Sequence, residues 1–289
     1  MSTPRYFESN YKFFGHLIID QQAVQDINAG KYKMYIQIFY LPQGYKLKID
    51  FNEYTTDGPA FFFVSGNQYI QILETGTAEA HYIYYTRDFY CIQIHDAEVA
   101  CDGIVFNNIY NMPMTKLPAP EAKAVNDVYT LLIDELTQKE SSHEEMIRTC
   151  LKQLIIRGTR LWKKQQLNHL QDEPEREIEF FRDFSKLVEI HYKSKHAVSE
   201  YADLLGLAPK TLSAKFSRLH LTPPNDIIKD RIVLEAKRLL CYTSNSVKEI
   251  AYQLGYDDPA YFNRMFTNKT GDSPAVFKKK YHQEEKVQF

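Results

Sequence analysis

Short apolar runs alternate with turn signals along the first part of the chain. The runs are rich in β-branched and aromatic residues and lie between residues 31 and 115: KMYIQIFYL, YKLKIDF, AFFFV, YIQIL, HYIYYT and FYCIQI. The segments PQG, TTDGP and SGNQ separate several of them. Such runs, with glycine, proline and asparagine between them, are typical of antiparallel strands in a barrel or sandwich. We therefore expect residues 1–117 to form an all-β domain.

A helical period replaces this pattern from Glu121 onward. Apolar residues recur every three or four positions in two stretches, which the polar segment KESSHEE separates. This spacing predicts two amphipathic helices within residues 118–172. Their apolar stripes have two interpretations: packing against the β-domain, or a helical seam between two copies of the chain. The stripe residues are Val125, Val128, Leu131, Leu132 and Leu136, then Met146, Ile147, Leu151, Leu154, Ile155 and Leu161.

A polar stretch at residues 163–177, KKQQLNHLQDEPERE, predicts a domain boundary because it contains Pro174 and no apolar period. A new helical period begins at Ile178 and continues to Tyr281. A chain of 289 residues is long enough for two cores. We therefore predict a two-domain α+β protein whose C-terminal domain, residues 177–283, is all-α.

The C-terminal part contains an internal repeat. Residues 198–207, VSEYADLLGL, align with residues 247–256, VKEIAYQLGY, at an offset of 49. With one inserted residue, the positions Leu212, Phe216 and Pro224 align with Phe262, Phe266 and Pro274. Self-similarity of this kind indicates that one supersecondary unit is used twice.

Each copy has the parts of a helix-turn-helix unit. A small residue, Ala202 or Ala251, lets the second helix cross close to the first. Four residues later, Gly206 or Gly255 is expected to adopt the positive φ that ends the first helix. The second helices are predicted at residues 209–218 and 259–267.

The second copy also carries the stronger start signals. Ser246 and Glu249 have the spacing of a capping box, and Asp258 precedes Pro259 as an N-cap residue does. The first copy has Pro209 at the matching helix start but weaker caps.

One face of each second helix is apolar, and the other is a polar row of the size that enters a major groove. Asparagine and arginine can pair bidentately with adenine and guanine. Lys269 is a candidate for the phosphate backbone. The outward residues, our candidate DNA-binding residues, are Lys210, Thr211, Ser213, Ala214 and Arg218, then Ala260, Tyr261, Asn263 and Arg264.

Charge is distributed unevenly, which supports a nucleic-acid partner. The whole chain has a net charge of -2. Residues 177–283 contain 17 Lys and Arg against 13 Asp and Glu, or +4, which leaves 18 against 24, or -6, for the rest. Only the C-terminal part is therefore suited to phosphate.

Residues 246–281, SVKEIAYQLGYDDPAYFNRMFTNKTGDSPAVFKKKY, together with YADLLGLAPKTLSAKF before them, resemble the DNA-binding domain of the AraC/XylS family of transcription regulators. The resemblance implies two helix-turn-helix units joined by a long helix, reading two successive turns of one groove of promoter DNA. Two positions depart from the family. Ala214 stands where members often have arginine, and Leu221 where they usually have glycine. We therefore expect the first reading helix to specify fewer bases.

The order of strands and helices in the N-terminal half is similar to the cupin-like sensor and dimerisation module of sugar-responsive family members. This similarity implies an effector-responsive activator that forms a homodimer and acts on RNA polymerase. Thirteen tyrosines and ten phenylalanines within residues 1–115 are consistent with an aromatic pocket for a small molecule, and equally with ordinary sheet composition. No ligand residue is identified. An effector-independent architectural DNA-binding protein and a cupin-like enzyme are the alternatives.

Known catalytic and metal-binding motifs are missing from the sequence. It has no GxSxG, HExxH or glycine-rich phosphate loop, and His16, His81 and His95 form no HxH pair. We therefore expect no catalytic residue, cofactor or metal. The first residues lack a signal-peptide pattern, and the apolar run at residues 60–64 is too short to cross a membrane, so we expect a cytoplasmic protein. Four scattered cysteines indicate neither a zinc site nor disulfides: Cys91, Cys101, Cys150 and Cys241.

Overall fold

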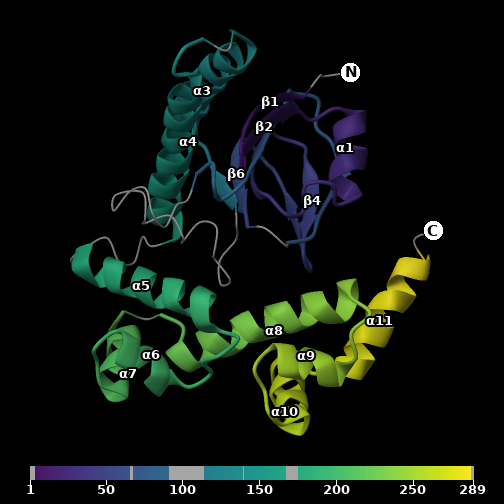
Figure 1. The fold of residues 1–289 in the computed structure, drawn as a ribbon, viewed down its shortest axis with the longest axis vertical. Helices are drawn as coiled ribbons and strands as arrows, with labels where there is room; N and C mark the ends of the chain where they lie inside the picture. Colours follow the sequence, from purple (N-terminus) through teal and green to yellow (C-terminus); the bar gives the residue numbers. More distant parts are fainter. Residues whose placement is uncertain are drawn as a thin grey trace. The chain divides into compact units, whose positions relative to one another are not determined.

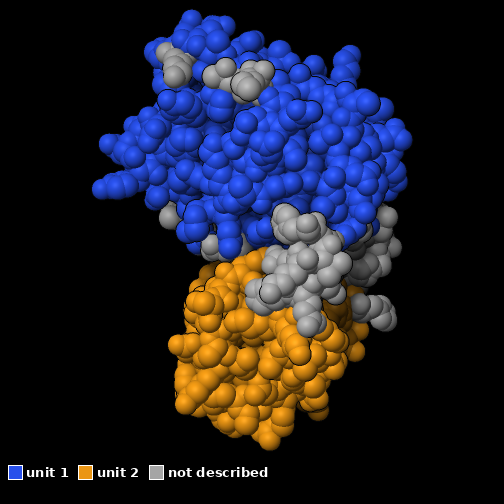
Figure 2. All heavy atoms as spheres, turned by 90° about the vertical axis from the view of Figure 1, so that its right-hand side faces the viewer, with its two compact units in different colours: residues 1–172 blue, residues 173–289 orange. Residues whose placement is uncertain are grey.

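The computed structural model describes residues 4–65, 68–90, 114–138, 140–166, 175–219 and 221–287 (Figure 1). The chain divides into two compact units, residues 1–172 and 173–289, which Figure 2 colours blue and orange. The first unit contains both the predicted β-region and the predicted helical pair. Residues 167–174 of the predicted boundary lie outside the described residues.

The first unit is rich in β-strands, as predicted. A six-stranded antiparallel sheet has the order β1-β2-β8-β3-β6-β9, and a three-stranded sheet has the order β5-β4-β7. Five of the predicted runs each contain a strand, and residues 91–94 of the sixth run lie outside the described part. The strands are β1 (Arg5–Ser9), β2 (Lys12–Ile18), β3 (Ile36–Leu41), β4 (Lys46–Ile49), β5 (Asn52–Thr55), β6 (Ala60–Val64), β7 (Ile70–Glu74), β8 (His81–Tyr85) and β9 (Met114–Lys116).

A hydrophobic core joins the two sheets. Phe39, Phe62 and Tyr82 come from the larger sheet, Leu47 and Ile72 from the smaller one, and all five are buried. The short helix α1 (Gln21–Asn28) adds further apolar side chains to this core. Among the described strands neither sheet closes on itself. The structure thus has two sheets around one core, and the closed cupin-like barrel remains a prediction.

Two helices, α3 (Ala119–Gln138) and α4 (His143–Gln166), cover the other face of the larger sheet (Figure 1). The Tyr129 ring of α3 stacks on His81 of β8, and a Cβ at Gly158 of α4 would overlap the Phe63 ring of β6. Every residue of β6 and β8 is buried, because both faces of the sheet are covered.

The apolar stripes of these helices mostly face their own sheet. Val125, Leu132, Ile147 and Leu154 are fully buried within the chain. Two predicted stripe residues, Leu131 and Met146, are instead exposed. Packing against the β-region accounts for the buried stripes, while a homodimer seam remains a prediction.

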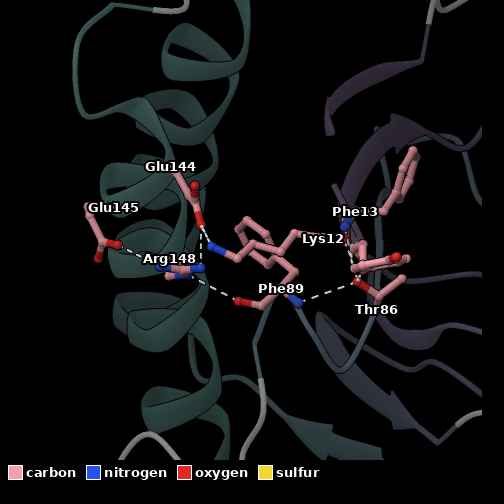
Figure 3. Close-up of polar contacts among 8 residues, drawn as sticks. Lys12, Phe13, Thr86, Phe89, Glu144, Glu145 and Arg148 are labelled. Atoms are coloured by element: carbon pink, nitrogen blue, oxygen red, sulfur yellow. Dashed lines mark hydrogen bonds and ion pairs between the residues drawn. The ribbon is translucent and has the colours of Figure 1, made fainter. Parts of the chain in front are cut away.

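Polar contacts attach the first turns of α4 to β2 and to the turn after β8 (Figure 3). The Nε of Arg148 donates to the Phe89 carbonyl oxygen at 3.0 Å, and its guanidinium also pairs with Glu144. The Nζ of Lys12 lies 2.8 Å from the same Glu144 carboxylate. Because these charges are partly buried and share partners, they form a network rather than an isolated surface pair.

Seven helices make up the described part of the second unit. Figure 1 shows the long helix α8 with α6 and α7 towards one end and α9 and α10 towards the other. In the described residues of both units, no helix combines the length and apolarity needed to cross a membrane. The helices are α5 (Glu175–His191), α6 (Val198–Leu204), α7 (Pro209–Arg218), α8 (Pro224–Tyr242), α9 (Val247–Gln253), α10 (Pro259–Thr270) and α11 (Pro274–Val287).

Candidate nucleic-acid interface

The two turns of the repeat have the predicted geometry. Ala202 and Ala251 are fully buried where the helices of each pair cross. Gly206 has φ +65° and Gly255 has φ +81°, both in the left-handed region that favours glycine. These four positions therefore make two helix-turn-helix units, α6–α7 and α9–α10.

The second helix-turn-helix unit, α9–α10, has complete caps. The Oγ of Ser246 accepts from the Glu249 amide at 3.2 Å, and Glu249 Oε2 accepts from the Ser246 amide at 2.7 Å. These hydrogen bonds lower the pKa of the Glu249 carboxyl. At the start of α10, Asp258 Oδ1 accepts from the Ala260 amide at 2.8 Å. The predicted capping box and N-cap are confirmed.

The first helix-turn-helix unit, α6–α7, has only half of a capping box. Glu200 Oε2 accepts from the amides of Ala197 and His196 at 2.9 and 2.8 Å, which lowers the pKa of the Glu200 carboxyl. Ala197 at the N-cap has no side-chain oxygen to return a bond, and Ala208 before α7 has none either.

The predicted second helices present one buried and one exposed face. Leu212 and Phe216 on α7, and Phe262 and Phe266 on α10, are at most 1% exposed. The helix α7 has the predicted bounds, whereas α10 continues three residues further than predicted, to Thr270. The structure leaves exposed all nine outward residues: Lys210, Thr211, Ser213, Ala214, Arg218, Ala260, Tyr261, Asn263 and Arg264.

The second exposed row is partly ordered by its own contacts. The Arg264 guanidinium lies 6.0 Å from the centre of the Tyr261 ring, and that ring lies 5.9 Å from Tyr256. An arginine held over an aromatic ring loses less conformational freedom when it pairs with a base. The equivalent row on α7 has only short side chains between Lys210 and Arg218: Thr211, Ser213 and Ala214.

Lys269 is placed differently from the other predicted residues. Its Nζ lies 2.7 Å from Asp226 Oδ1 and 2.9 Å from Asp230 Oδ1, both on α8. Burial alone would lower the pKa of Lys269, but the two carboxylates outweigh that effect and raise it. In the structure this amine bridges two helices of the unit, so its predicted phosphate contact would require breaking ion pairs.

Comparison with known proteins identifies this part of the chain. Residues 201–280 match the family model of a helix-turn-helix domain. The chain is 34% identical over 76 residues to the HTH-type transcriptional activator RhaS of Yersinia pseudotuberculosis, an alignment that covers 26% of this chain and 28% of the relative. It is 32% identical over 78 residues to the HTH-type transcriptional activator Btr of Bacillus subtilis, covering 27% and 15%. Residues 201–280 form an AraC/XylS-type helix-turn-helix domain.

These alignments leave most of each curated relative unmatched, since the chain spans less than a third of their length. Among solved structures, the chain is similar over 94% of its length to ToxT from Vibrio cholerae with a bound unsaturated fatty acid, at 13% sequence identity and a TM-score of 0.37. That alignment covers 96% of the solved chain.

Residues 173–289 contain a contact that the sequence pattern did not predict. The turn of the second unit lies against the segment that enters the first unit. His196 Nε2 lies 2.9 Å from the Leu254 carbonyl oxygen, and the His196 ring stacks on Tyr256 at 4.3 Å. A Cβ at Gly255 would overlap the Lys193 carbonyl oxygen, whereas one at Gly206 would meet nothing within 4 Å.

A buried arginine holds α5 against α8 within residues 173–289. The Arg231 guanidinium donates twice to Glu189 on α5, at 2.6 and 2.9 Å, and once to Glu235 at 3.1 Å. It also lies 3.8 Å from the centre of the Tyr192 ring. Burial would lower the pKa of Arg231, but Glu189, Tyr192 and Glu235 raise it. Arg231 therefore remains charged and joins α5, which precedes the first helix-turn-helix unit, to α8, which connects the two helix-turn-helix units.

Proposed function

We propose that the protein is a sequence-specific, DNA-binding transcription regulator and that it is an effector-responsive activator. One observation carries the proposal: two copies of the same helix-turn-helix unit each expose a polar row directly above a buried apolar pair. Two such rows, joined by α8 in one compact unit, fit two successive major-groove segments of one DNA duplex.

In this mechanism α10 is the main reader of base edges. Asn263 and Arg264 have the donors and acceptors for bidentate contacts to adenine and guanine. The exposed residues Lys210, Thr211 and Ser213 of α7 face base edges too but specify fewer bases, and Arg218 contacts the phosphate backbone. The N-terminal turn of α7, where no side chain caps the backbone amides, adds donors that favour phosphate oxygens. Tyr261 limits the motion of Arg264 before binding.

The remaining partners follow from the regulator proposal. A homodimer would place two domains on paired half-sites and raise avidity through effective concentration. A small-molecule effector would bind the first unit, and RNA polymerase would be the partner at the promoter. Both curated relatives described above are named transcriptional activators, which supports activation as the outcome.

The test is selection of genomic fragments by the full-length protein. Affinity for the selected fragment and for a scrambled copy is then measured across a salt series. We expect a preference of about a thousandfold or more, with affinity that falls steeply as salt rises. Equal affinity for both fragments would favour an effector-independent architectural protein, and no binding at low salt would contradict the proposal.

A further inference from the structure

Four side chains form a row of contacts from the segment before the first helix-turn-helix unit to the exposed face of α10. The His196 ring stacks on the Tyr256 ring, with the ring centres 4.3 Å apart. The Tyr256 ring lies 5.9 Å from the Tyr261 ring, and the Tyr261 ring lies 6.0 Å from the Arg264 guanidinium. The row therefore begins outside the second helix-turn-helix unit and ends at the arginine that we propose reads a base.

The backbone at His196 is held by the first helix-turn-helix unit. The His196 amide donates to Glu200 Oε2 at 2.8 Å. The Tyr201 hydroxyl donates to the Lys195 carbonyl oxygen at 2.9 Å. Because Glu200 and Tyr201 both lie on α6, two hydrogen bonds to that helix fix the backbone from which the His196 ring extends.

The His196 ring itself is held by the second helix-turn-helix unit. Its Nε2 lies 2.9 Å from the Leu254 carbonyl oxygen. A carbonyl oxygen can only accept a hydrogen bond, so Nε2 carries the proton and donates. Leu254 is the C-cap residue of α9, and the hydrogen bond satisfies one of the carbonyl groups that a helix leaves open at its end. Turning the ring would break this hydrogen bond as well as the stacking on Tyr256.

Tyr256 connects this fixed ring to the exposed face of α10. Its side chain is 6% exposed and also contacts the Phe262 ring, whose centre lies 5.5 Å away. Tyr261 is 53% exposed and rests against Tyr256. Loss of the His196 ring would leave space into which Tyr256 can move, because the surroundings refill such a space only in part. Tyr261 and Arg264 would then lose a fixed support.

The first helix-turn-helix unit has no matching row. The positions that correspond in the repeat carry an aliphatic or a short side chain: Leu207, Thr211 and Ala214. The turn at Gly206 forms without aromatic rings at these positions, so the helix-turn-helix fold does not require them. Their presence beside Arg264 in the second copy favours a role in placing that arginine.

We propose that His196 is a positioning residue for base reading, which holds Arg264 in its base-pairing orientation through the two tyrosine rings. The proposal rests on the proposed function, since it requires α10 to read DNA. In this arrangement a residue that precedes the first helix-turn-helix unit sets the base preference of the second one.

The first measurement needs no DNA. NMR relaxation of the Arg264 Nε–Hε group, assigned by its loss in Arg264→Ala, reports the order of this side chain in the free full-length protein. We expect His196→Ala to lower the order parameter of this group. His196→Phe keeps a ring on Tyr256 and should keep the order parameter near its wild-type value.

His191→Ala is the matched control, because it removes a half-buried histidine of α5 that lies five residues before His196. It should leave the order parameter of Arg264 unchanged, and thermal unfolding shows that each variant is folded. An unchanged order parameter in folded His196→Ala would overturn the proposal, whether or not the protein binds DNA.

The second measurement is base preference, taken from affinities for the selected fragment and its single-base variants. Arg264→Ala locates the base pair that Arg264 reads. We expect His196→Ala to weaken the preference at that base pair about fivefold, with no change at the other base pairs. In the Arg264→Ala background it should have no further effect there, and His196→Phe should keep most of the preference.

Two results would overturn the proposal from the side of DNA binding. One is an equal loss of preference at every base pair in His196→Ala, and the other is an additional loss in the Arg264→Ala background. Wild-type protein that prefers no fragment would instead contradict the proposed function. Intact wild-type preference that His196→Ala leaves unchanged would overturn only the role of His196.

Discussion

The two helix-turn-helix units share one sequence pattern but differ in what supports them. The turn of the first unit, at Gly206, has open space where a side chain would extend. The turn of the second unit, at Gly255, lies against the Lys193 carbonyl, and Leu254 and Tyr256 on either side contact His196. Equivalent positions of a repeat can therefore contribute differently to the free energy of unfolding. Here only the second turn also packs against the segment that precedes the first helix-turn-helix unit.

The largest difference is expected between Gly255→Ala and Gly206→Ala. At Gly206 the substitution meets only the strain of positive φ, about 1–2 kcal/mol. At Gly255 the same strain is joined by overlap with the Lys193 carbonyl, for a total on the order of 3 kcal/mol or more. Hydrogen exchange of the α6 and α9 amides in the full-length protein measures both. Equal destabilisation by the two substitutions would contradict the packing of Gly255 against the Lys193 carbonyl.

Arg264→Ala tests whether the second unit is the main reader. Loss of a bidentate base contact should cost about 1–3 kcal/mol of binding and relax the preference at one base pair. Ser213→Ala, at an exposed position of α7, should change the preference less. Affinities for single-base variants of the selected fragment measure both effects. A uniform loss across all variants would make Arg264 a phosphate contact instead.

The difference in capping can be reversed between the units. Ser246→Ala should destabilise α9 by about 1 kcal/mol, since it removes one half of a capping box. Ala197→Ser should stabilise α6 by a similar amount, because Ala197 is exposed, has extended backbone and already receives the Glu200 half. Urea unfolding followed by circular dichroism measures the two changes. Destabilisation by Ala197→Ser would show that the cap geometry differs from the one described.

The smallest effect is expected for Lys269→Ala. Its ion pairs with Asp226 and Asp230 are partly exposed, so their loss should cost about 0.5–1 kcal/mol of stability. Base preference should stay unchanged, because the amine faces α8 rather than the exposed row. The same unfolding experiment and the same fragment series measure it, and a relaxed preference at one base pair would contradict this placement.

Local signals in the sequence predicted the helices of residues 173–289 well. Pro209, Asp258 and the two turn glycines act through their own backbone, so their effect on structure can be read without knowing the fold. The contact of His196 with Leu254 could not be predicted, because it joins residues 58 positions apart that follow no shared periodicity. The ion pairs of Lys269 were missed for the same reason.

Residues 1–172 were predicted less completely. Apolar runs such as AFFFV indicated strands, but a run buried on both faces does not say what covers each face. The pairing of β2 with β8 brings Phe14 beside Tyr85, and no local pattern encodes that separation.

The covering of the larger sheet on both sides limits how this protein can be divided. A fragment cut at residue 117 would keep the described strands but would lose the helices that shield Phe61, Phe63, Ile83 and Tyr85. Such a fragment would expose a large hydrophobic patch and would aggregate. The smallest exchangeable module in residues 1–172 is therefore the strands together with α3 and α4, so recombination or engineering that moves this region must move them as one piece.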